Sequence, residues 1–492
     1  MARILIVAYT NYHQDSRVKR NAEALAERGD QVDVICLADG PRGISRAVNI
    51  LALKMPRYRG NSKSAYLGSY LRFFAMASVS ATRLSRGKPY DVVIVCTMPD
   101  AAVICALGPK FYGARVVLDI HDTMPELFHD KFKGVRGALG GRLLMAEERV
   151  SAWLADRVLA VHELHRQRLE RAGVPASKIS VVMNIPDRRL FGPLRIVEDT
   201  PPVMGNISRQ GRQDSVGGRA PETEHAAEED EAFRLVCHGT LTSRLGLDLA
   251  VRAVELVRKT IPSIHLQVIG EGDFLPTARE LTERLGLERH VTFTPPMAVE
   301  QLPPALARAA VGIVPNRASR ATHLMLPAKL LEYASLGIPV IAARLRTIEY
   351  YFPTGTVRYF EPGDVHGLAG AIEDLYRHPE KRQAFGRRAG VIAATLSWEH
   401  QRDELFAAID SLLVSRRMSR IHNSASSLGQ TSFSLSPANA RAKAGAASNT
   451  NNGSGAHSFS GHARPRIYQR EHQLEQAASC VVQPAAMNSS RP

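Results

Sequence analysis

The chain has 492 residues, of which 45% are apolar and 23% are charged, a composition typical of a globular protein with two or three domains. Its formal net charge is +15, and much of that charge lies beyond residue 415, so the rest of the chain is only moderately basic. A moderate positive charge suits phosphate-bearing ligands or an anionic membrane surface, and it gives no reason to expect a nucleic acid partner.

Cysteine usage and apolar runs narrow the class of protein further. The five cysteines are scattered, odd in number and never form a CxxC pair, which argues against a disulfide framework or a zinc site. No run approaches the length of about 18 apolar residues that a transmembrane helix needs. The first segment, "MARILIVAYTNYHQ", turns polar too soon for a signal peptide. We therefore expect a cytoplasmic protein, either soluble or peripheral at the inner face of the plasma membrane.

Residues 1–197 alternate between strand-like and helix-like segments. The strands are predicted at continuous apolar runs, 3–9, 31–37, 91–97, 115–122, 157–162 and 179–184. Helical segments such as "SRVKRNAEALAERG" separate them, and several of these end in glycine, a common helix stop. Apolar strands that alternate with helices indicate a parallel sheet covered on both faces.

The alternation stops and then resumes. Residues 198–232 are polar and acid-rich, and we expect a disordered linker or insertion there. Residues 233–396 return to the earlier pattern, with strands predicted at 234–240, 265–270, 291–294, 311–315 and 339–343. A helix at 397–417 closes the folded part, and residues 418–492 form a low-complexity tail that we expect to be disordered. The predicted fold class is α/β, with two Rossmann-like doubly wound domains facing an interdomain cleft, where ligands bind in such folds.

The segment "LPAKLLEYASLGIPVIAA", residues 326–343, is the first candidate site. Pro327 suits the first turn of a helix because its fixed φ matches that position and its missing N–H would be unbonded there anyway. The amides of Leu324, Met325 and Leu326 are then expected to face the cleft at the positive end of the helix dipole, where they could bind a diphosphate.

Two charged residues follow inside the same predicted helix. Glu332 would lie about 7 Å along the helix axis from Pro327, where a carboxylate can accept hydrogen bonds from two ribose hydroxyls. Lys329 shares a face with Glu332, since residues three apart are neighbours on a helix. An exposed Lys329–Glu332 ion pair of little energetic importance is the alternative explanation for both residues.

The segment "HGTLTSRLGLDLAVRAVELV", residues 238–257, is the second candidate site. A strand ends at Gly239 and Thr240, a short loop carries Arg244, and Gly246 precedes an amphipathic helix. A guanidinium at the carboxyl edge of the sheet can neutralise a departing phosphate through two hydrogen bonds. An ordinary solvated loop arginine is the alternative.

The segment "DIHDTMPELF", residues 119–128, leaves a strand of the first domain. His121 would approach the cleft from the opposite side, within reach of a sugar, with the carboxylates Asp119, Asp122 and Glu126 nearby. A histidine with a purely structural role is the alternative. No GxGxxG motif opens a helix anywhere in the chain, so a dinucleotide-dependent oxidoreductase is disfavoured.

Seven segments, in this order and at these separations, carry a family resemblance. They are "DSRVKRNAEALAERGDQVDVICL", "DIHDTMPELF", "DRVLAVHELHRQRL", "VVMNIPDRRLF", "HGTLTSRLGLDLAVRA", "LQVIGEGD" and "PAKLLEYASLGIPVIAA". Over residues 3–190 and 233–412 the chain resembles the GT-B-fold retaining glycosyltransferases of family 4 (group 1), particularly the bacterial exopolysaccharide and lipopolysaccharide type.

The resemblance implies roles for individual residues. Glu332 matches the second glutamate of the family's E-x7-E motif, which binds the donor ribose. Arg244 matches the basic residue that contacts the donor diphosphate, and His121 matches a histidine that approaches the transferred sugar. The backbone around Pro296 and Met297 falls where the base is held. The helix at 397–417 would cross back onto the first domain.

The chain also departs from the family pattern at two positions, and the loop after its first strand lacks the family's common glycines. Leu324 stands where the first glutamate of E-x7-E is expected, a residue that commonly contacts sugar hydroxyls. Thr240 stands where many members carry another arginine at the diphosphate. Lys329 is the residue that could compensate, since relatives with a P-x-K-x-x-E-Y form exist. The departures leave the identity of the donor sugar open.

The implied activity is that of a retaining hexosyltransferase. It would move a sugar from a UDP- or GDP-linked donor to a hydroxyl of a saccharide or lipid-linked acceptor, in polysaccharide or glycolipid assembly. No carboxylate pair of the glycosidase type and no metal-ligand cluster is visible, so we predict a metal-independent enzyme without a further cofactor. Two alternatives stay open: a sugar-nucleotide-binding scaffold with impaired catalysis, signalled by Leu324, and a GT-B-fold sugar-nucleotide epimerase.

Residues 42–89 combine many basic side chains with Leu, Phe and Tyr. This composition suits a surface that contacts an anionic membrane carrying a lipid-linked acceptor. It equally suits a helix with a solvated basic face and an apolar face that packs inward.

Overall fold

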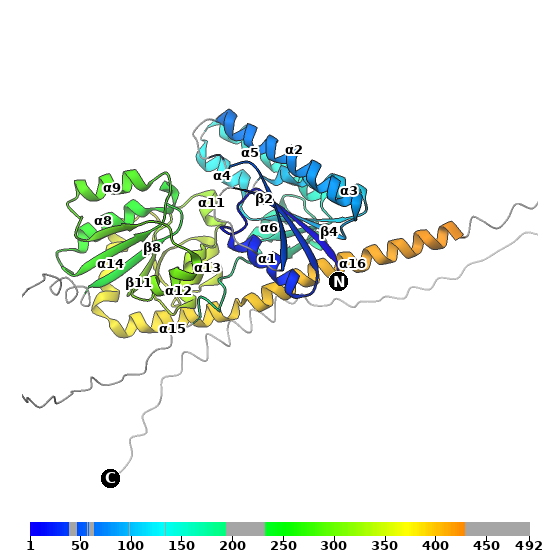
Figure 1. Ribbon diagram of the computed structural model, residues 1–492. Coiled ribbons are helices and arrows are strands. Elements are labelled where there is room, and N and C mark those ends of the chain that lie inside the picture. Colours follow the sequence, from blue (N-terminus) through cyan, green and yellow to red (C-terminus); the bar gives the residue numbers. More distant parts are fainter. Residues whose placement is uncertain are drawn as a thin grey trace, which may run out of the picture. The chain divides into compact units, whose positions relative to one another are not determined.

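The computed structural model describes residues 1–38, 47–56, 58, 63–97, 99–132, 134–192 and 232–428. The expected linker at 198–232 lies outside these residues except for Ala232, and the expected tail lies outside them from residue 429 onward. Within the described residues, the chain builds two separate parallel sheets covered by helices (Figure 1). The predicted α/β class with two Rossmann-like domains is confirmed.

The first sheet has seven parallel strands in the order β3-β2-β1-β4-β5-β6-β7. These strands are β1 (Arg3–Ala8), β2 (Gln31–Leu37), β3 (Val48–Leu53), β4 (Val92–Cys96), β5 (Arg115–Ile120), β6 (Arg157–Ala160) and β7 (Ile179–Val181). The strand order reverses between β1 and β4. Doubly wound folds bind ligands at such a point, beyond the carboxyl ends of the strands.

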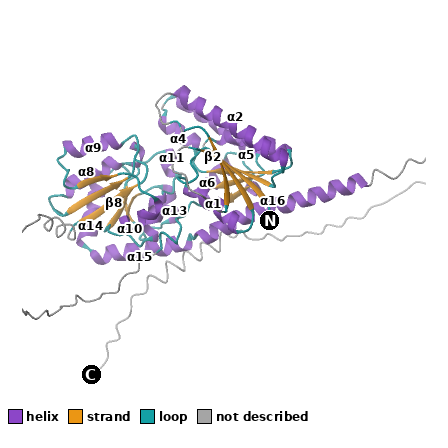
Figure 2. Cartoon of the chain, in the orientation of Figure 1, coloured by secondary structure: helices purple, strands orange, loops and turns teal. Residues whose placement is uncertain are grey.

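Helices cover both faces of this sheet. They are α1 (Ser16–Glu27), α2 (Lys63–Gly87), α3 (Leu107–Phe111), α4 (Met124–Lys131), α5 (Val135–Leu154) and α6 (Glu163–Arg171), with short 3-10 segments η1 (Asp100–Ala106) and η2 (Ala176–Lys178). Alternate residues of β1 point to opposite faces, as strand geometry requires. Leu5 and Val7 join a core with α2, η1 and α5, whereas Ile4 and Ile6 join a core with α1. Figure 2 shows the helices around the strands of this sheet.

The second sheet has six parallel strands in the order β10-β9-β8-β11-β12-β13. These strands are β8 (Phe233–His238), β9 (Ile264–Ile269), β10 (Val291–Thr294), β11 (Val311–Val314), β12 (Val340–Ala343) and β13 (Arg358–Phe360). The helices around it are α8 (Leu247–Val257), α9 (Leu275–Arg284), α10 (Leu302–Leu306), α11 (Arg320–His323), α12 (Ala328–Ser335), α13 (Arg346–Tyr351), α14 (Val365–Arg377) and α15 (Pro379–Thr395). Two 3-10 segments, η3 (Ser243–Leu245) and η4 (Val299–Gln301), complete the list.

The last helix, α16 (Trp398–Leu428), leaves the second sheet and packs on the first. Its residues Leu405, Ile409 and Leu412 share a core with β1, β2 and α1. The helix is longer than the expected 397–417, because neither glycine nor proline interrupts residues 418–428 and Gly429 follows them.

Two strands, β3 and β13, were not expected from the sequence. β3 is an edge strand whose middle is partly exposed, with Leu51 at 38% exposure, and its apolar residues lie in the basic region 42–89 that was interpreted as helical. β13 has only three residues at the opposite edge of the second sheet. Short or half-exposed edge strands give a weak periodic signal.

The basic region at 42–89 contains β3 and α2. One face of α2 packs inward through Tyr70, Phe73 and Ala77, so the inward-packing alternative holds for that face. On its outer face Leu67 and Leu71 stay exposed, at 59% and 57%. Within the described residues, no helix combines the length and the apolar character needed to cross a bilayer.

Four of the five cysteines are free and buried in the structure: Cys36, Cys96, Cys105 and Cys237. Cys480 lies outside the described residues.

Candidate functional site

The loop after β8 positions Arg244 at the carboxyl edge of the second sheet. Arg244 lies in η3, and its carbonyl accepts a hydrogen bond from the amide of Arg317, at 3.0 Å, in the loop after β11. Its Nε atom is buried without a hydrogen-bond partner, and no ion pair involves its guanidinium within the described residues. A buried guanidinium nitrogen without an acceptor is costly, so an anionic ligand at this edge would satisfy it.

Gly246 fixes the path of this loop. It has φ +69° and caps the start of α8, a conformation that only glycine adopts easily. A Cβ atom at this position would lie 1.9 Å from the carbonyl oxygen of Pro315 at the end of β11. The close approach brings the loops after β8 and β11 together, and Arg244 lies at that junction.

The charged residues of α12 do not pair with each other. The alternative explanation, an exposed Lys329–Glu332 ion pair, is therefore wrong. Lys329 is buried at 8% exposure, and its Nζ lies 3.8 Å from Sγ of Cys237 at the end of β8. Glu332 accepts a hydrogen bond at Oε2 from Nε2 of His238, at 2.5 Å. Both side chains therefore reach the carboxyl end of β8.

His238 and Tyr333 hold Glu332 in place. Nδ1 of His238 lies 2.8 Å from the Tyr333 hydroxyl, which in turn donates to the carbonyl of Val236, at 3.3 Å. The Tyr333 ring packs against Gly312 of β11, where a Cβ atom would lie 2.3 Å from it. Burial raises the pKa of Tyr333 well above its ordinary value, so its hydroxyl remains a neutral donor.

The three predicted amide donors before α12 are only partly available. The amides of Leu324 and Met325 donate to the carbonyls of Ala321 and Thr322, at 3.0 and 3.2 Å, because they close the preceding helix α11. The expectation that both face the cleft as free donors is therefore wrong. Leu326, with Leu324 and Met325, does line a cavity, described below.

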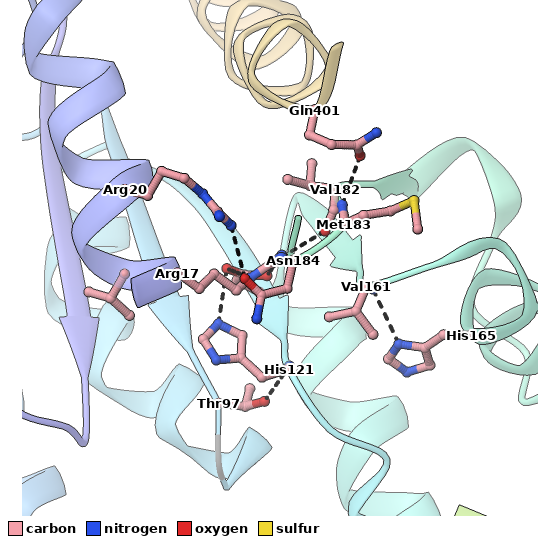
Figure 3. A network of polar contacts seen from close by, with 12 residues as sticks. Arg17, Arg20, Thr97, His121, Val161, His165, Val182, Met183, Asn184 and Gln401 are labelled. Carbon is pink, nitrogen blue, oxygen red and sulfur yellow. Dashed lines mark hydrogen bonds and ion pairs between the residues drawn. The ribbon is translucent and has the colours of Figure 1, made fainter. Parts of the chain in front are cut away.

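In the first domain, Arg17, Asp119 and His121 form a buried network (Figure 3). Arg17 of α1 donates from Nε and Nη2 to the two carboxylate oxygens of Asp119 on β5, at 3.1 and 2.6 Å. His121 places Nε2 at 3.1 Å from Asp119 Oδ2. The ring is thereby fixed at the strand end, with Nδ1 as its remaining nitrogen.

The network also determines the charge state of its members. Burial opposes ionisation of Asp119, but Arg17 and His121 outweigh it and hold the pKa of the carboxyl well below its usual range. Burial likewise opposes a charged imidazole, yet Asp119 raises the pKa of His121 above its ordinary value. His121 therefore stays charged to a higher pH than an ordinary imidazole does.

His162 joins the two domains. It ends the stretch after β6 and caps α6, where Nδ1 accepts from the amide of His165, at 3.0 Å. Nε2 must then carry the proton, and it lies 2.9 Å from the carbonyl oxygen of Leu324 in the second domain. Burial lowers the pKa of His162 to about 4, so this imidazole is neutral at pH 7.

Arg17, His121 and His162 lie at a cavity of about 330 Å³ between the two domains. From the first domain it is lined by Asp15, Ser16, Arg17, His121, Asp122, Thr123, Leu127, Val161, His162 and Asn184, and from the second by Ala321, Leu324, Met325, Leu326, Pro327, Ala328 and Leu331. The structure thus brings His121 together with the segment before α12, as predicted. The walls are largely polar on the first-domain side and apolar on the second.

The other predicted residues lie along the edge of the second sheet rather than in this cavity. Thr240 is exposed just after β8, close in sequence to Arg244. Pro296 is exposed and Met297 is half-buried in the loop after β10. No hydrogen bond or ion pair in the described residues joins Arg244 to Lys329 or Glu332. The roles assigned to these residues stay predictions.

One group of potential metal ligands adjoins the cavity: Cys96, Asp119 and His121, whose ligand atoms lie within 4.8 Å of one another. The group fits a cation poorly. Arg17 already occupies both oxygens of Asp119. Burial raises the pKa of the Cys96 thiol well above its ordinary value, which disfavours the thiolate that binds metals.

Several residues around the cavity were not singled out from the sequence. Arg17 and Arg20 lie on an amphipathic helix, where arginines ordinarily face solvent, yet Arg17 is 3% exposed. Arg20 donates to Asn184 Oδ1 at 2.9 Å, and burial together with Arg17 lowers its pKa to about 10. His162 is the last residue of the strand predicted at 157–162, so its place at a strand end was the available signal.

Two parallel-sheet domains with a polar cavity between them define the GT-B class of fold, and solved structures agree. Anabaena Alr3699/HepE in complex with UDP-glucose is similar, with a TM-score of 0.59, 16% identity and coverage of 84% of this chain and all (100%) of that one. Sucrose-phosphate synthase from Thermosynechococcus elongatus gives a TM-score of 0.63 at 15% identity, with coverage of 84% and 100%. At these identities the likeness establishes the fold alone.

Sequence comparison identifies the family. Residues 14–184 match the glycosyl transferase 4-like domain, and residues 232–378 match the glycosyl transferases group 1 domain. The chain belongs to the group 1 glycosyltransferases.

Curated relatives are similar over part of their length. The GDP-mannose-dependent alpha-(1-6)-phosphatidylinositol monomannoside mannosyltransferase of Mycolicibacterium smegmatis is 29% identical over 235 residues, covering 45% of this chain and 58% of that protein. The Mycobacterium tuberculosis protein of the same name is 30% identical over 269 residues, with coverage of 50% and 66%. D-inositol 3-phosphate glycosyltransferase of Paenarthrobacter aurescens is 26% identical over 198 residues, with coverage of 38% and 47%. The chain therefore matches less than two thirds of the length of each of these relatives.

Proposed function

We propose that this protein transfers a sugar from a nucleoside-diphosphate donor to an acceptor hydroxyl, with retention of configuration. The observation that carries the proposal is a pair of cations at the carboxyl edge of the second sheet. Lys329 is buried and Arg244 has a buried Nε, yet neither has a carboxylate partner within the described residues. A buried cation without a counter-ion is strongly unfavourable, so the site suits a ligand that brings its own negative charge.

A nucleoside diphosphate supplies that charge, and Glu332 suits the attached ribose. His238 occupies Oε2 of Glu332 and leaves Oε1 to accept a hydroxyl. Pro296 and Met297, two strands away in the loop after β10, are the candidates for contact with the base. The mannosyltransferase relatives are named as GDP-mannose-dependent, and HepE was solved with UDP-glucose, so both UDP- and GDP-linked sugars are candidate donors.

The proposed mechanism is electrostatic. Arg244 and Lys329 stabilise the negative charge that develops on the diphosphate as the glycosidic bond loosens. His121, biased toward its charged form by Asp119, orients the sugar from the first domain through Nδ1. The departing phosphate oxygen takes the proton of the acceptor hydroxyl, so no general base from the chain and no metal is required. Chelators should therefore leave the rate unchanged.

Incubation of the protein with UDP- and GDP-sugars and candidate acceptors tests this function. Release of nucleoside diphosphate coupled to a new glycosidic bond supports it, and NMR of the product reports whether the anomeric configuration is retained. An epimerase would yield an isomerised sugar nucleotide without release. A scaffold would bind the nucleotide in a thermal-shift assay without turnover. Either result would refute the transferase assignment.

We further propose that the protein contacts an anionic membrane at the inner face of the plasma membrane, where a lipid-linked acceptor would lie. The helix α2 contains no acidic residue, and its exposed Leu67 and Leu71 precede the exposed Arg72. On α5, Trp153 is 75% exposed. Flotation with anionic vesicles at low salt tests this; binding that Leu67→Ser, Leu71→Ser and Trp153→Ser leave unchanged would contradict it.

A further inference from the structure

A second cavity, of about 300 Å³, adjoins α4 on a different helical face from the first. Thr123 and Leu127, four residues apart, line the first cavity, whereas Pro125, Glu126 and His129 line the second. At 3.6 residues per turn these two sets point in clearly different directions. The remaining walls of the second cavity are Ala138, Gly141, Arg142 and Met145 of α5 and Arg320 of α11.

The charge of this cavity is positive once its ion pairs are considered. Glu126 accepts from Nε and Nη2 of Arg168, at 2.8 and 3.2 Å, outside the cavity, and Arg168 also pairs with the buried Glu148. Arg142 and Arg320 are exposed, and neither forms an ion pair within the part of the chain that the structure describes. His129 adds a third potential donor. Two guanidinium groups and an imidazole therefore face one hollow whose lining carboxylate, Glu126, is held by Arg168.

The position of Arg320 is determined by a contact between the domains. The Asp130 carboxylate of α4 accepts from the amides of Arg320 and Ala321, at 3.3 and 3.0 Å. This contact fixes the start of α11 against α4, with Ala321 at the first cavity and Arg320 at the second. The second cavity is therefore complete only when the two domains meet, as expected of a substrate site.

We propose that this second cavity binds a phosphate group of the acceptor, held by Arg142, Arg320 and His129. Planar guanidinium groups donate two parallel hydrogen bonds to phosphate oxygens, and two of them can surround a tetrahedral anion. The small residues Ala138 and Gly141 leave room beside α5. The two cavities share α4 and α11 as walls, so the phosphate lies within about one helix diameter, 10 Å, of the first cavity.

The role of this phosphate in an acceptor rests on the proposed transferase function, whereas its binding is measurable without turnover. The phosphate could belong to a soluble sugar or cyclitol phosphate, or to a phospholipid headgroup. Leu139 and Leu143, 69% and 70% exposed, flank Arg142 on α5, so a lipid surface could also approach the cavity. The experiment below separates the two sources.

The test is calorimetric titration of the full chain with inorganic phosphate and with sn-glycerol 3-phosphate, with and without saturating UDP or GDP to occupy the donor site. Arg142→Ala and Arg320→Ala are compared with Arg83→Ala, which removes an exposed arginine of α2 outside the cavity. We expect each cavity variant to weaken phosphate binding by about tenfold or more, as loss of a charge-assisted pair implies. The control variant should stay within about twofold.

Phosphate affinity that is unchanged in both cavity variants, or reduced equally by Arg83→Ala, would overturn the proposal. Nucleotide affinity is measured in parallel. If neither the wild type nor any variant binds UDP or GDP, the proposed function is refuted. The phosphate site is then still decided by the phosphate titration alone.

Vesicle flotation then assigns the source. Phosphatidylcholine vesicles with and without phosphatidylglycerol are compared for the wild type, the cavity variants and Arg252→Ala, which removes an exposed arginine of α8. Vesicle binding that depends on Arg142 and Arg320 beyond the effect of Arg252 supports the phosphate site and indicates a lipid headgroup. Cavity-dependent binding of glycerol 3-phosphate alone supports the same site and indicates a soluble acceptor.

Discussion

Nε2 of His238 lies 2.5 Å from Oε2 of Glu332, so a residue at the end of β8 orients the carboxylate proposed to bind ribose. A carboxylate only accepts hydrogen bonds, so His238 is the donor and one oxygen of Glu332 is committed to it. The geometry explains how a glutamate on a short helix is held at a fixed angle to the edge of the sheet. It also suggests a sharp test of the ribose assignment.

Glu332→Gln should weaken the binding of UDP or GDP by about tenfold or more, because a hydrogen bond to a charged group is worth about 1.5–3 kcal/mol. The measurement is a comparison of each nucleotide with its 2′,3′-dideoxy analogue. The wild type should discriminate between them, and Glu332→Gln should lose that discrimination. Equal discrimination in both proteins would show that Glu332 does not contact the ribose. Glu349→Gln, which alters a surface ion pair with Arg344, is the matched control.

Arg244→Ala should lower kcat by about a hundred- to a thousandfold, the range seen when one stabilising donor at a developing charge is removed. The melting temperature should change little, because the Nε atom has no hydrogen bond to lose and the backbone contact with Arg317 remains. Arg252→Ala, which removes an exposed arginine from α8, is the control. A near wild-type rate in Arg244→Ala with an authentic donor would refute its role.

The pKa values of the two cavity histidines, His121 and His162, should be shifted in opposite directions. NMR of the imidazole protons should place the pKa of His121 above the ordinary value of about 6.5, owing to Asp119, and that of His162 near 4. Between pH 5 and pH 6, roughly, His121 is then charged and His162 neutral. A His162 that titrates normally would contradict its burial and its bond to Leu324.

The lowered pKa of His162 has a consequence for stability. The unfolded chain binds a proton at His162 below about pH 6.5, whereas the folded protein does so only near pH 4, so this group costs stability as the pH falls between those values. The full cost is of the order of 3 kcal/mol. Urea unfolding of the wild type and of His162→Gln at pH 7 and pH 4.5 should show a difference that depends on pH.

Gly246→Ala should destabilise the protein by about 1–3 kcal/mol or more, since alanine is strained at φ +69° and its Cβ would meet the carbonyl of Pro315. Gly68→Ala is the matched control within α2, where a Cβ would touch nothing within 4 Å. That substitution should instead stabilise by about 0.5–1 kcal/mol, from helix propensity. Thermal unfolding measures both, and similar effects at the two sites would contradict the role given to Gly246.

Glu147 on α5 provides a second pH test. Burial and the neighbouring Glu148 raise its pKa to about 7, although a hydrogen bond from Ser151 opposes the shift. The folded protein therefore holds this proton more tightly than the unfolded chain, and the group lowers stability as the pH rises from about 4.5 through 7. Glu147→Gln should raise the melting temperature at pH 8 and have little effect at pH 4. A difference that does not change with pH would contradict the raised pKa.

Much of the fold could be predicted because buried parallel strands leave a continuous apolar signal. The strands at the centre of each sheet, such as β1 and β8, agree with the predicted runs to within two residues. Two edge strands, β7 and β10, also fall in predicted runs, so segment order was sufficient for most of the architecture. The edge strands β3 and β13 were missed, because β3 lies in the basic region 42–89 that was interpreted as helical and β13 has only three residues.

The candidate site could be predicted only where a single segment carries the information. His121 and the residues before α12 follow strands, and the topology places strand ends at one edge. Arg17 lies 102 positions from its partner Asp119, and no local pattern connects them. The Leu324 and Met325 amides were assigned wrongly because the four-residue helix α11, which uses them, is too short to recognise in sequence.

The return of α16 to the first sheet affects how the chain can be shortened. Ile409 and Leu412 are part of the first domain's core, and Arg416 pairs with Asp91 beside β4. A chain shortened from its carboxyl end for crystallisation should therefore keep Arg416. Each domain expressed alone would be incomplete. The first domain would expose the apolar surface that α16 covers, and the second would carry an unpaired amphipathic helix prone to self-association.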